Sequence, residues 1–172
     1  MDNPMKVLIT GTNGQLGWEL QRTVPKGLQV TAFGHAELDI TDASAVELTI
    51  SDLNPDLVIN TAAYTAVDKA EEEAEKAYKV NAQGAANIAK AAANSNARLI
   101  HISTDFVFDG LQSSPYLPSD TTNPLGVYGA SKLEGERQVT EISPDALILR
   151  TGWLYSAHGH NFVKTMLNLM KL

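Results

Sequence analysis

A tyrosine and a lysine four residues apart, Tyr128 and Lys132, form the clearest candidate for chemistry in the sequence. Residues four apart lie on one face of a helix, so the phenol and the ammonium are predicted to point into the same space. A free phenol titrates with a pKa near ~10, and a nearby cation lowers that pKa because it stabilises the phenolate. Such a pair can exchange a proton with a substrate oxygen near neutral pH.

A second group of polar residues follows an apolar run of strand length at residues 98–103. In an open α/β sheet, ligands bind outside the carboxyl ends of the strands, so Thr104 would lie beside a ligand. We expect Thr104 to donate to a substrate carbonyl and Ser103 to serve backbone hydrogen bonds. Residues 60–64 (NTAAY) close another strand with small side chains that let a cofactor pass, whereas Tyr64 is either part of that wall or a packing aromatic.

Glycine recurs at Gly11, Gly14 and Gly17, directly after the first apolar run. Glycine permits a tight turn and the close approach of a pyrophosphate to the backbone. A helix that begins near Gln15 would aim its free N–H groups at that phosphate. The G-x-x-G-x-x-G spacing is similar to that of the extended short-chain dehydrogenase/reductases, and it predicts a dinucleotide cofactor.

The end of the second strand, residues 33–37 (FGHAE), bears on which cofactor binds. An acidic residue there binds the ribose 2′-OH of NAD, and a basic one accepts the 2′-phosphate of NADP. Neither follows the strand immediately. His35 facing a 2′-phosphate and His35 as an exposed loop residue are both open, and we expect NADPH, with NADH as the alternative.

Short apolar runs alternate with longer helical stretches along the whole chain. Strands that are nearly continuous apolar runs are buried on both faces, and strict alternation gives right-handed crossovers. The pattern predicts an α/β fold: a doubly wound parallel sheet of Rossmann type in three layers, α/β/α, with strand order 3-2-1-4-5. The expected strands cover residues 6–10, 28–33, 57–60, 98–103 and 146–150, and the expected helices cover residues 16–24, 42–53, 68–94 and 125–142.

Two other segments are distinctive in composition. The acidic run at residues 70–77 is predicted to be a solvated helix start, where the helix dipole favours negative charge. Residues 105–124 contain three prolines and are predicted to form a long loop. Long loops in compact domains are usually functional or mobile.

Composition narrows the functional classes. The 172 residues include 13 Lys and Arg, 20 Asp and Glu and no cysteine, for a net charge of −7. One domain is expected, and thiolate chemistry, disulfides and thiolate metal sites are excluded. The acidic balance argues against binding nucleic acid, and no apolar run approaches the roughly 20 residues that span a membrane. The start of the sequence does not resemble a signal peptide, so a cytoplasmic location is expected, and we predict no metal site.

Five motifs carry a family resemblance: GTNGQLG, NTAAYTAVDKAE, STDFVFDG, YGASK and RTGWLY, in this order. Together they resemble the dTDP-4-dehydrorhamnose reductase family of the extended short-chain dehydrogenase/reductases. The resemblance implies reduction of the C4 keto group of dTDP-4-dehydro-L-rhamnose to dTDP-L-rhamnose, in dTDP-rhamnose and cell-surface polysaccharide biosynthesis. It implies a nucleotide-sugar substrate, and it allows a homodimer.

The same resemblance implies roles for individual residues. Tyr128 would protonate the C4 keto oxygen, Lys132 would lower the pKa of Tyr128 and hold the nicotinamide ribose, and Thr104 would hydrogen-bond the same oxygen. Asp105 and Trp153 would approach the sugar nucleotide. The implied cofactor-binding residues are Gly11, Asn13, Gly14, Gln15, Leu16 and Gly17 at the pyrophosphate, Asp39 and Ile40 at the adenine, and Ala62, Ala63 and Tyr64 along the cofactor.

Two other functions share the expected fold. A sugar-nucleotide dehydratase of the superfamily has Thr-Asp-Glu, whereas this sequence has Thr104, Asp105 and Phe106, which disfavours elimination; an epimerase or another sugar-nucleotide reductase is the related alternative. A regulatory subunit similar to the β subunit of methionine adenosyltransferase would bind NADP without catalysis. The complete set of Thr104, Tyr128 and Lys132 favours chemistry.

The sequence stops at Leu172 inside a helical pattern that covers residues 161–172 without glycine or proline. Members of the resembled family continue into a further block that forms most of the sugar-nucleotide pocket. We therefore expect residues 1–172 to be the NAD(P)-binding domain with the catalytic residues, and the substrate-binding part to be largely absent. Such a chain should bind NADP(H) but reduce substrate poorly or not at all.

Overall fold

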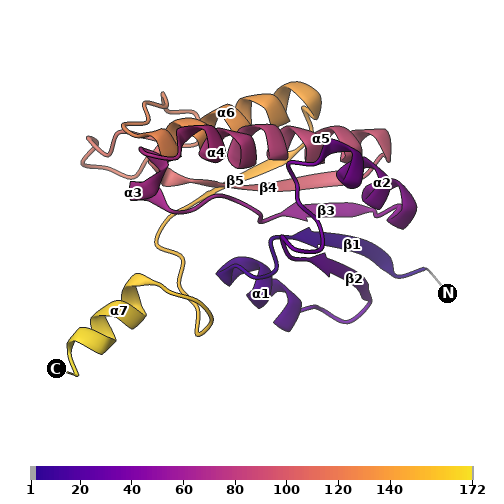
Figure 1. The fold of residues 1–172 in the computed structure, drawn as a ribbon, viewed down its shortest axis with the longest axis horizontal. Helices are drawn as coiled ribbons and strands as arrows, with labels where there is room; N and C mark the ends of the chain where they lie inside the picture. Colours follow the sequence, from indigo (N-terminus) through magenta and orange to yellow (C-terminus); the bar gives the residue numbers. More distant parts are fainter. Residues whose placement is uncertain (1–2, 172) are drawn as a thin grey trace.

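The computed structural model describes residues 3–171, which form a parallel sheet between two layers of helices (Figure 1). The predicted α/β fold is confirmed. The strands are β1 (Met5–Thr10), β2 (Leu28–Phe33), β3 (Leu57–Asn60), β4 (Arg98–Thr104) and β5 (Leu147–Thr151). The helices are α1 (Gln15–Arg22), α2 (Ala43–Leu53), α3 (Val67–Ala70), α4 (Ala74–Tyr78), α5 (Ala85–Asn94), α6 (Val127–Ile142) and α7 (Phe162–Leu169), with a π-helix η1 (Lys79–Gly84) and a 3₁₀ helix η2 (Asp105–Val107).

The strand order is β2-β1-β3-β4-β5, and all neighbours are parallel. The predicted order 3-2-1-4-5 is therefore wrong. The crossover through α2 carries the chain back past β1, so Thr10 of β1 lies opposite both Phe33 and Asn60. From β1 the chain passes to β2 on one side of the sheet, and from β3 it passes to β4 and β5 on the other. The topological switch point therefore lies between the carboxyl ends of β1 and β3. Ligands of open α/β sheets bind at such points.

The helices are divided between the two faces of the sheet. Helix α1 lies on one face of the sheet, and α2, α4, α5 and α6 lie on the other (Figure 1). The hydrophobic core fills the space between the sheet and α2, α5 and α6. Helix α5 approaches the sheet closely because most of its buried residues are alanines. The core includes Leu8, Val58 and Leu99 from the sheet, Val46 and Ile50 from α2, Ile88 from α5 and Val139 from α6.

The single helix predicted over residues 68–94 is wrong, because the chain there forms α3, a turn, α4, η1 and α5. The π-helix η1 places Asn81 so that its side chain accepts from the Tyr64 N–H (2.8 Å) and donates to the Tyr64 carbonyl (3.1 Å). It also donates to the Ser131 hydroxyl at 3.0 Å. Tertiary hydrogen bonds thus favour the π-turn, which apolar periodicity does not reveal.

Helix α6 runs unusually close to its neighbours at two glycines. A Cβ at Gly129 would overlap the carbonyl of Phe106, and one at Gly135 would overlap the carbonyl of Asn81. The close approach sets the position of the first turn of α6, which carries Tyr128, against the segment that follows β4.

After β5 the chain leaves the sheet and crosses toward α1, and α7 lies apart from the main body (Figure 1). Within the described chain, α7 contributes no buried residue. The predicted loop at residues 105–124 is present, although it starts with η2. Among residues 3–171, no helix is both long and apolar enough to span a bilayer.

Candidate active site

The glycine-rich turn between β1 and α1 is shaped by close backbone contacts. Gly11 has φ 77°, in the left-handed region, and a Cβ there would lie 2.5 Å from the Ala62 nitrogen. A Cβ at Gly17 would lie 2.5 Å from the Gly11 carbonyl oxygen. Gly14 is the N-cap of α1, and no side chain of the described residues caps this helix. The free N–H groups of its first turn can therefore receive a phosphate, and the turn fits a dinucleotide pyrophosphate.

This turn forms one end of a cleft of about 740 Å³ at the carboxyl ends of the strands. The volume is typical of a small-molecule site. The switch point between β1 and β3 lies in its floor, as the strand order requires. Eleven of the predicted site residues line it: Asn13, Gly14, Gln15, Leu16, Gly17, Ala63, Thr104, Asp105, Tyr128, Lys132 and Trp153.

Tyr128 reaches this cleft from the first turn of α6. Its ring packs edge-on against Phe106, with ring centroids 5.6 Å apart. Burial raises the pKa of Tyr128, the Thr104 hydroxyl opposes this rise, and the charge of Asp105 adds to it. The phenol is consequently protonated at neutral pH, as a proton donor must be.

Lys132 lies one turn further along α6 and is only 2% exposed. Its Nζ donates to the Ile102 carbonyl oxygen at 2.6 Å. Burial lowers the pKa of Lys132 to about 8, against the opposing effect of Glu136. The ammonium thus binds the backbone of β4, and burial dominates the pKa of Tyr128. The roles of Lys132 in lowering that pKa and in holding a nicotinamide ribose stay predictions.

Thr104 ends β4 beside the phenol. Its hydroxyl donates to Asp105 Oδ1 (3.1 Å) and accepts from the Phe106 N–H (3.2 Å). The Asp105 carboxylate in turn lies against the backbone of Gly152, the residue after β5, so closely that a Cβ on Gly152 would overlap it. For Thr104 to donate to a substrate oxygen, its hydroxyl hydrogen must therefore turn away from Asp105.

A buried polar chain supports the floor of the cleft. The Thr10 hydroxyl donates to Asn60 Oδ1 (2.7 Å), and Asn60 Nδ2 lies 3.1 Å from His101 Nδ1. Burial and the charge of Lys132 lower the pKa of His101 well below its usual value, so the ring is neutral. With Asn60 as donor, Nδ1 is the acceptor and Nε2 carries the hydrogen, and this Nε2 has no partner within residues 3–171.

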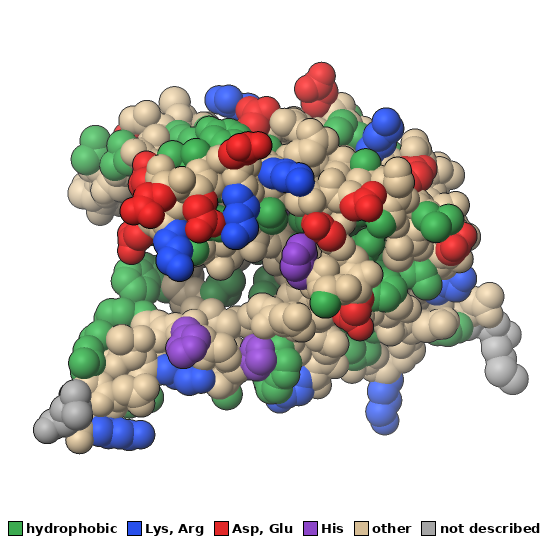
Figure 2. All heavy atoms as spheres, viewed as in Figure 1, with side chains coloured by type: hydrophobic (Ala, Val, Ile, Leu, Met, Phe, Trp, Pro, Cys, Tyr) green, Lys and Arg blue, Asp and Glu red, His purple; other side chains and the backbone are tan. Residues whose placement is uncertain are grey.

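Residues 153–161 cross back from β5 and form the far wall of the cleft; we call them the strap. The His158 ring stacks on Trp18 (centroids 5.0 Å apart), and its Nε2 lies 3.1 Å from the Asn13 carbonyl oxygen. Asn161 Nδ2 donates to Gln15 Oε1 at 2.9 Å. We call residues 153–171, which comprise the strap and α7, the C-terminal arm. Figure 2 shows the hollow between the main body and this arm. Sequence reasoning missed the strap; its only local signal is the polar run at residues 156–161.

Five predicted cofactor residues lie elsewhere. Gly11 and Ala62 form the backbone contact behind the turn, and Ile40 belongs to the core. Asp39 accepts from the Thr41 N–H, which lowers the pKa of its carboxyl. The Tyr64 hydroxyl donates to Glu73, and burial together with Glu73 raises the pKa of Tyr64. The cofactor-binding roles of these residues stay predictions.

One prediction about polar residues is wrong, and a second, the solvated helix start in the acidic run, holds only in part because Glu72 and Glu75 are exposed. The Ser103 hydroxyl donates to the buried carboxylate of Glu136, not to the backbone. The acidic run is not simply solvated, because Glu71 accepts from the Val127 N–H (2.8 Å) at the start of α6, and Glu73 bonds Tyr64 and Lys76. In the part of the chain that the structure describes, no three His, Asp or Glu residues gather in a group that could hold a metal ion.

Comparison with known proteins gives consistent similarities. The family model described as "RmlD substrate binding domain" matches residues 5–172. A dTDP-4-dehydrorhamnose reductase from Aggregatibacter actinomycetemcomitans is 48% identical over 168 residues, which are 96% of this chain and 57% of the relative. The corresponding reductase from Escherichia coli is 45% identical over 171 residues, with 97% of this chain and 57% of the relative covered.

Solved structures give the same picture. A dTDP-4-dehydrorhamnose reductase from Clostridium acetobutylicum superposes with a TM-score of 0.94 at 49% identity, over 97% of this chain and 60% of that one. The reductase from Bacillus anthracis, solved in complex with NADP, gives a TM-score of 0.95 at 43% identity with the same coverage. The chain therefore spans a little more than half the length of these relatives.

Proposed function

Because the chain belongs to the RmlD substrate binding domain family, we propose that it is the cofactor-binding and catalytic portion of an NADPH-dependent dTDP-4-dehydrorhamnose reductase. One observation carries the proposal: the start of α1 after the glycine turn, which no side chain within residues 3–171 caps, and the Tyr128–Thr104 pair face the same cleft. Phosphate binding and proton transfer thus have their groups at opposite ends of one site. The NADP in the Bacillus anthracis relative supports NADPH as the cofactor, with NADH as the alternative.

The chemistry divides between cofactor and protein. NADPH, when bound, supplies the hydride. The first turn of α1 would hold the pyrophosphate, and the Lys132 ammonium, which lines the cleft, would hold the nicotinamide ribose. The Tyr128 phenol, kept protonated by burial, donates its proton to the C4 keto oxygen of dTDP-4-dehydro-L-rhamnose. The Thr104 hydroxyl donates to the same oxygen and orients it.

The proposal extends beyond the site. It includes a nucleotide-sugar substrate, a cytoplasmic location, a role in cell-surface polysaccharide biosynthesis and a homodimer. Residues Asp105 and Trp153, which line the cleft, would contact the sugar nucleotide. The names of the relatives support the nucleotide-sugar substrate.

A binding and turnover experiment tests the proposal. NADPH fluorescence should rise on titration with the chain, and addition of dTDP-4-dehydro-L-rhamnose should oxidise NADPH slowly. Tyr128→Phe should lower turnover by about 10²- to 10⁴-fold and leave the NADPH Kd unchanged, because the hydroxyl acts in the transition state.

Tyr78→Phe, on the exposed side of α4, is the matched control and should change neither quantity. A chain that does not bind NADPH contradicts the proposal. Binding with a turnover that Tyr128→Phe leaves unchanged contradicts the assigned proton donor. A full-length protein that binds NADPH without any turnover would favour the regulatory-subunit alternative.

A further inference from the structure

A buried ion pair lies behind the candidate active site, outside the lining of the cleft. We propose that Glu136 and Arg150 are positioning residues, which hold Tyr128 and Thr104 in register and fasten the loop at residues 105–124 beside them. This inference rests on the proposed function, because it assigns the pair to the same proton-transfer site.

Glu136 connects the helix of the phenol to the strand of the threonine. It lies four residues after Lys132 and eight after Tyr128, on the same face of α6. Its carboxylate accepts from the hydroxyl of Ser103, the residue before Thr104, at 2.5 Å. Any slip of α6 along β4 would break this bond, so the bond fixes the distance between the phenol and the Thr104 hydroxyl.

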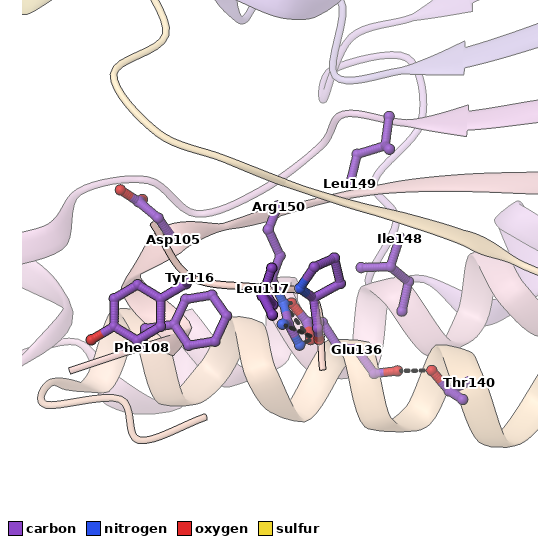
Figure 3. A pocket seen from close by; sticks show the side chains of 10 residues that line it. Asp105, Phe108, Tyr116, Leu117, Glu136, Thr140, Ile148, Leu149 and Arg150 are labelled. Carbon is purple, nitrogen blue, oxygen red and sulfur yellow. Dashed lines mark hydrogen bonds and ion pairs between the residues drawn. The ribbon is translucent and has the colours of Figure 1, made fainter. Parts of the chain in front are cut away.

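Arg150 holds that carboxylate from the neighbouring strand β5. Its Nε donates to Glu136 Oε1 (3.0 Å) and its Nη2 donates to Oε2 (2.7 Å), a forked pair of bonds that fixes orientation as well as distance. The side chains are 6% exposed for Glu136 and 24% for Arg150. Figure 3 shows the guanidinium against the carboxylate, with the loop residues Phe108 and Tyr116 beside them.

The same guanidinium fastens the loop. It lies over the Phe108 ring, 5.0 Å from the centroid, and its Nη1 donates to the Pro118 carbonyl at 3.2 Å. Phe108 stacks on Tyr116 (centroids 4.3 Å apart), whose hydroxyl donates to Asp109 at 2.7 Å. Arg150 thus binds both arms of a loop whose first residue bonds the Thr104 hydroxyl.

A role in register explains why an ion pair occupies this place. Buried ion pairs are often no more stabilising than apolar side chains of similar size, and their best-attested use is to specify one arrangement. Here the pair joins α6, β4, β5 and the loop at one point. Since neither residue faces the cleft, its loss should affect proton transfer more than cofactor binding.

Substitutions in the ion pair, matched by controls on α6, test the assignment. Glu136→Gln keeps an acceptor for Ser103 but removes the negative charge. Arg150→Met removes both the positive charge and the forked pair of hydrogen bonds, whereas Arg150→Lys keeps the charge without the fork. The controls are Glu134→Gln and Arg137→Lys, which alter the exposed Glu134–Arg137 pair of the same helix. We measure kcat, KM for NADPH, the NADPH Kd and site-resolved hydrogen exchange for each variant.

Glu136→Gln and Arg150→Met should lower kcat at least tenfold with the NADPH Kd within about twofold of wild type. Arg150→Lys should recover part of the loss. Arg150→Met should raise hydrogen exchange in the loop at residues 105–124 and in the first turn of α6 but not in β1 or α1. The two controls should match wild type in every quantity.

Unchanged kcat and exchange in the Glu136 and Arg150 variants would overturn the inference. Exchange that rises equally throughout the sheet, with a parallel loss of NADPH binding, would also overturn it, because the pair would then only stabilise the fold. A wild-type chain that shows no turnover counts against the proposed function alone. The exchange of the loop and of the first turn of α6 then decides the inference.

Discussion

Burial acts in opposite directions on two residues that share one face of α6. It raises the pKa of the Tyr128 phenol and lowers the pKa of the Lys132 ammonium to about 8, because in both cases the charged form loses solvation. At neutral pH the phenol is therefore neutral and the ammonium charged. These protonation states suit proton donation by Tyr128, which is the direction that reduction of a ketone requires.

The buried ammonium predicts a pH dependence of stability. The folded-state pKa of Lys132, about 8, lies below the usual lysine value of 10.5, so the unfolded chain binds more protons between these values. The free energy of unfolding of the wild type, relative to Lys132→Met, should rise as the pH increases through this window. Urea unfolding of both proteins at about pH 7 and about pH 9.5 measures the difference.

Lys90→Met, on α5, is the control and should show a smaller change of this difference with pH. If the free energy of unfolding of the wild type, relative to Lys132→Met, decreases from the lower to the higher pH, then Lys132 is not a desolvated, charged lysine in the folded protein.

The glycine turn is sensitive to a single methyl group. Gly17→Ala would place a Cβ against the Gly11 carbonyl, so α1 must move away from the turn. We expect NADPH affinity to fall at least tenfold, measured by fluorescence titration. Gly27→Ala is the control: its φ of 89° makes the substitution strained, but its Cβ meets no neighbour, so affinity should stay at the wild-type value. Equal losses in both variants would contradict the assigned role of the turn.

At the scale of elements, local pattern predicted most of the fold and long-range contacts decided the rest. Apolar runs located all five strands, and the Asp42 carboxylate caps α2 by accepting from the N–H groups of Ser44 and Ala45. The strand order and the breaks between α3 and α5 were not predictable, because a crossover and the hydrogen bonds of Asn81 set them. The convergence of the glycine turn, Thr104 and Tyr128 was predictable, because parallel strands end at one edge of the sheet. The link from Arg150 to this site was not predictable, because it depends on tertiary contacts with Glu136.

The π-helix makes a prediction at this scale. Asn81→Ala should remove the bonds to both backbone groups of Tyr64 and to Ser131. Leaving such buried groups unpaired costs about 2–4 kcal/mol in the free energy of unfolding. Urea denaturation measures the loss. Asn94→Ala, which removes an exposed bond to Glu47, should cost less than about 1 kcal/mol; equal losses would show that η1 does not depend on Asn81.

At the scale of the whole molecule, apolar surface gathers on the side of β5 and on the C-terminal arm. Leu147 and Leu149 of β5 are exposed, as are Trp153, Phe162 and Met170 after it. The ends of the arm are held differently. The strap bonds α1 through Ser156 and Asn161 and the glycine turn through His158, whereas α7 buries nothing within the described chain. The cleft therefore has one wall that depends on a few polar contacts.

The stacking of His158 on Trp18 predicts a change in tryptophan fluorescence when His158 is removed. In a Trp153→Phe background, Trp18 is the remaining tryptophan and reports the His158 stack. His158→Ala should change Trp18 emission and weaken NADPH binding by about threefold to tenfold, the equivalent of one aromatic pair. Tyr155→Ala is the control and should leave both unchanged, because this exposed aromatic residue of the strap does not line the cleft. Emission that does not respond to His158→Ala would show that the stack is absent in solution.

The strap also orders events during synthesis. Its hydrogen bonds join residues 145 and 146 positions apart, so the ribosome adds the strap long after the glycine turn and the first helix. The sheet strands can pair as they emerge, since domains form from the N-terminus during translation. The nascent protein thus carries a finished nucleotide turn whose outer wall arrives only when Asn161 is released, and until then a cofactor would meet an open groove.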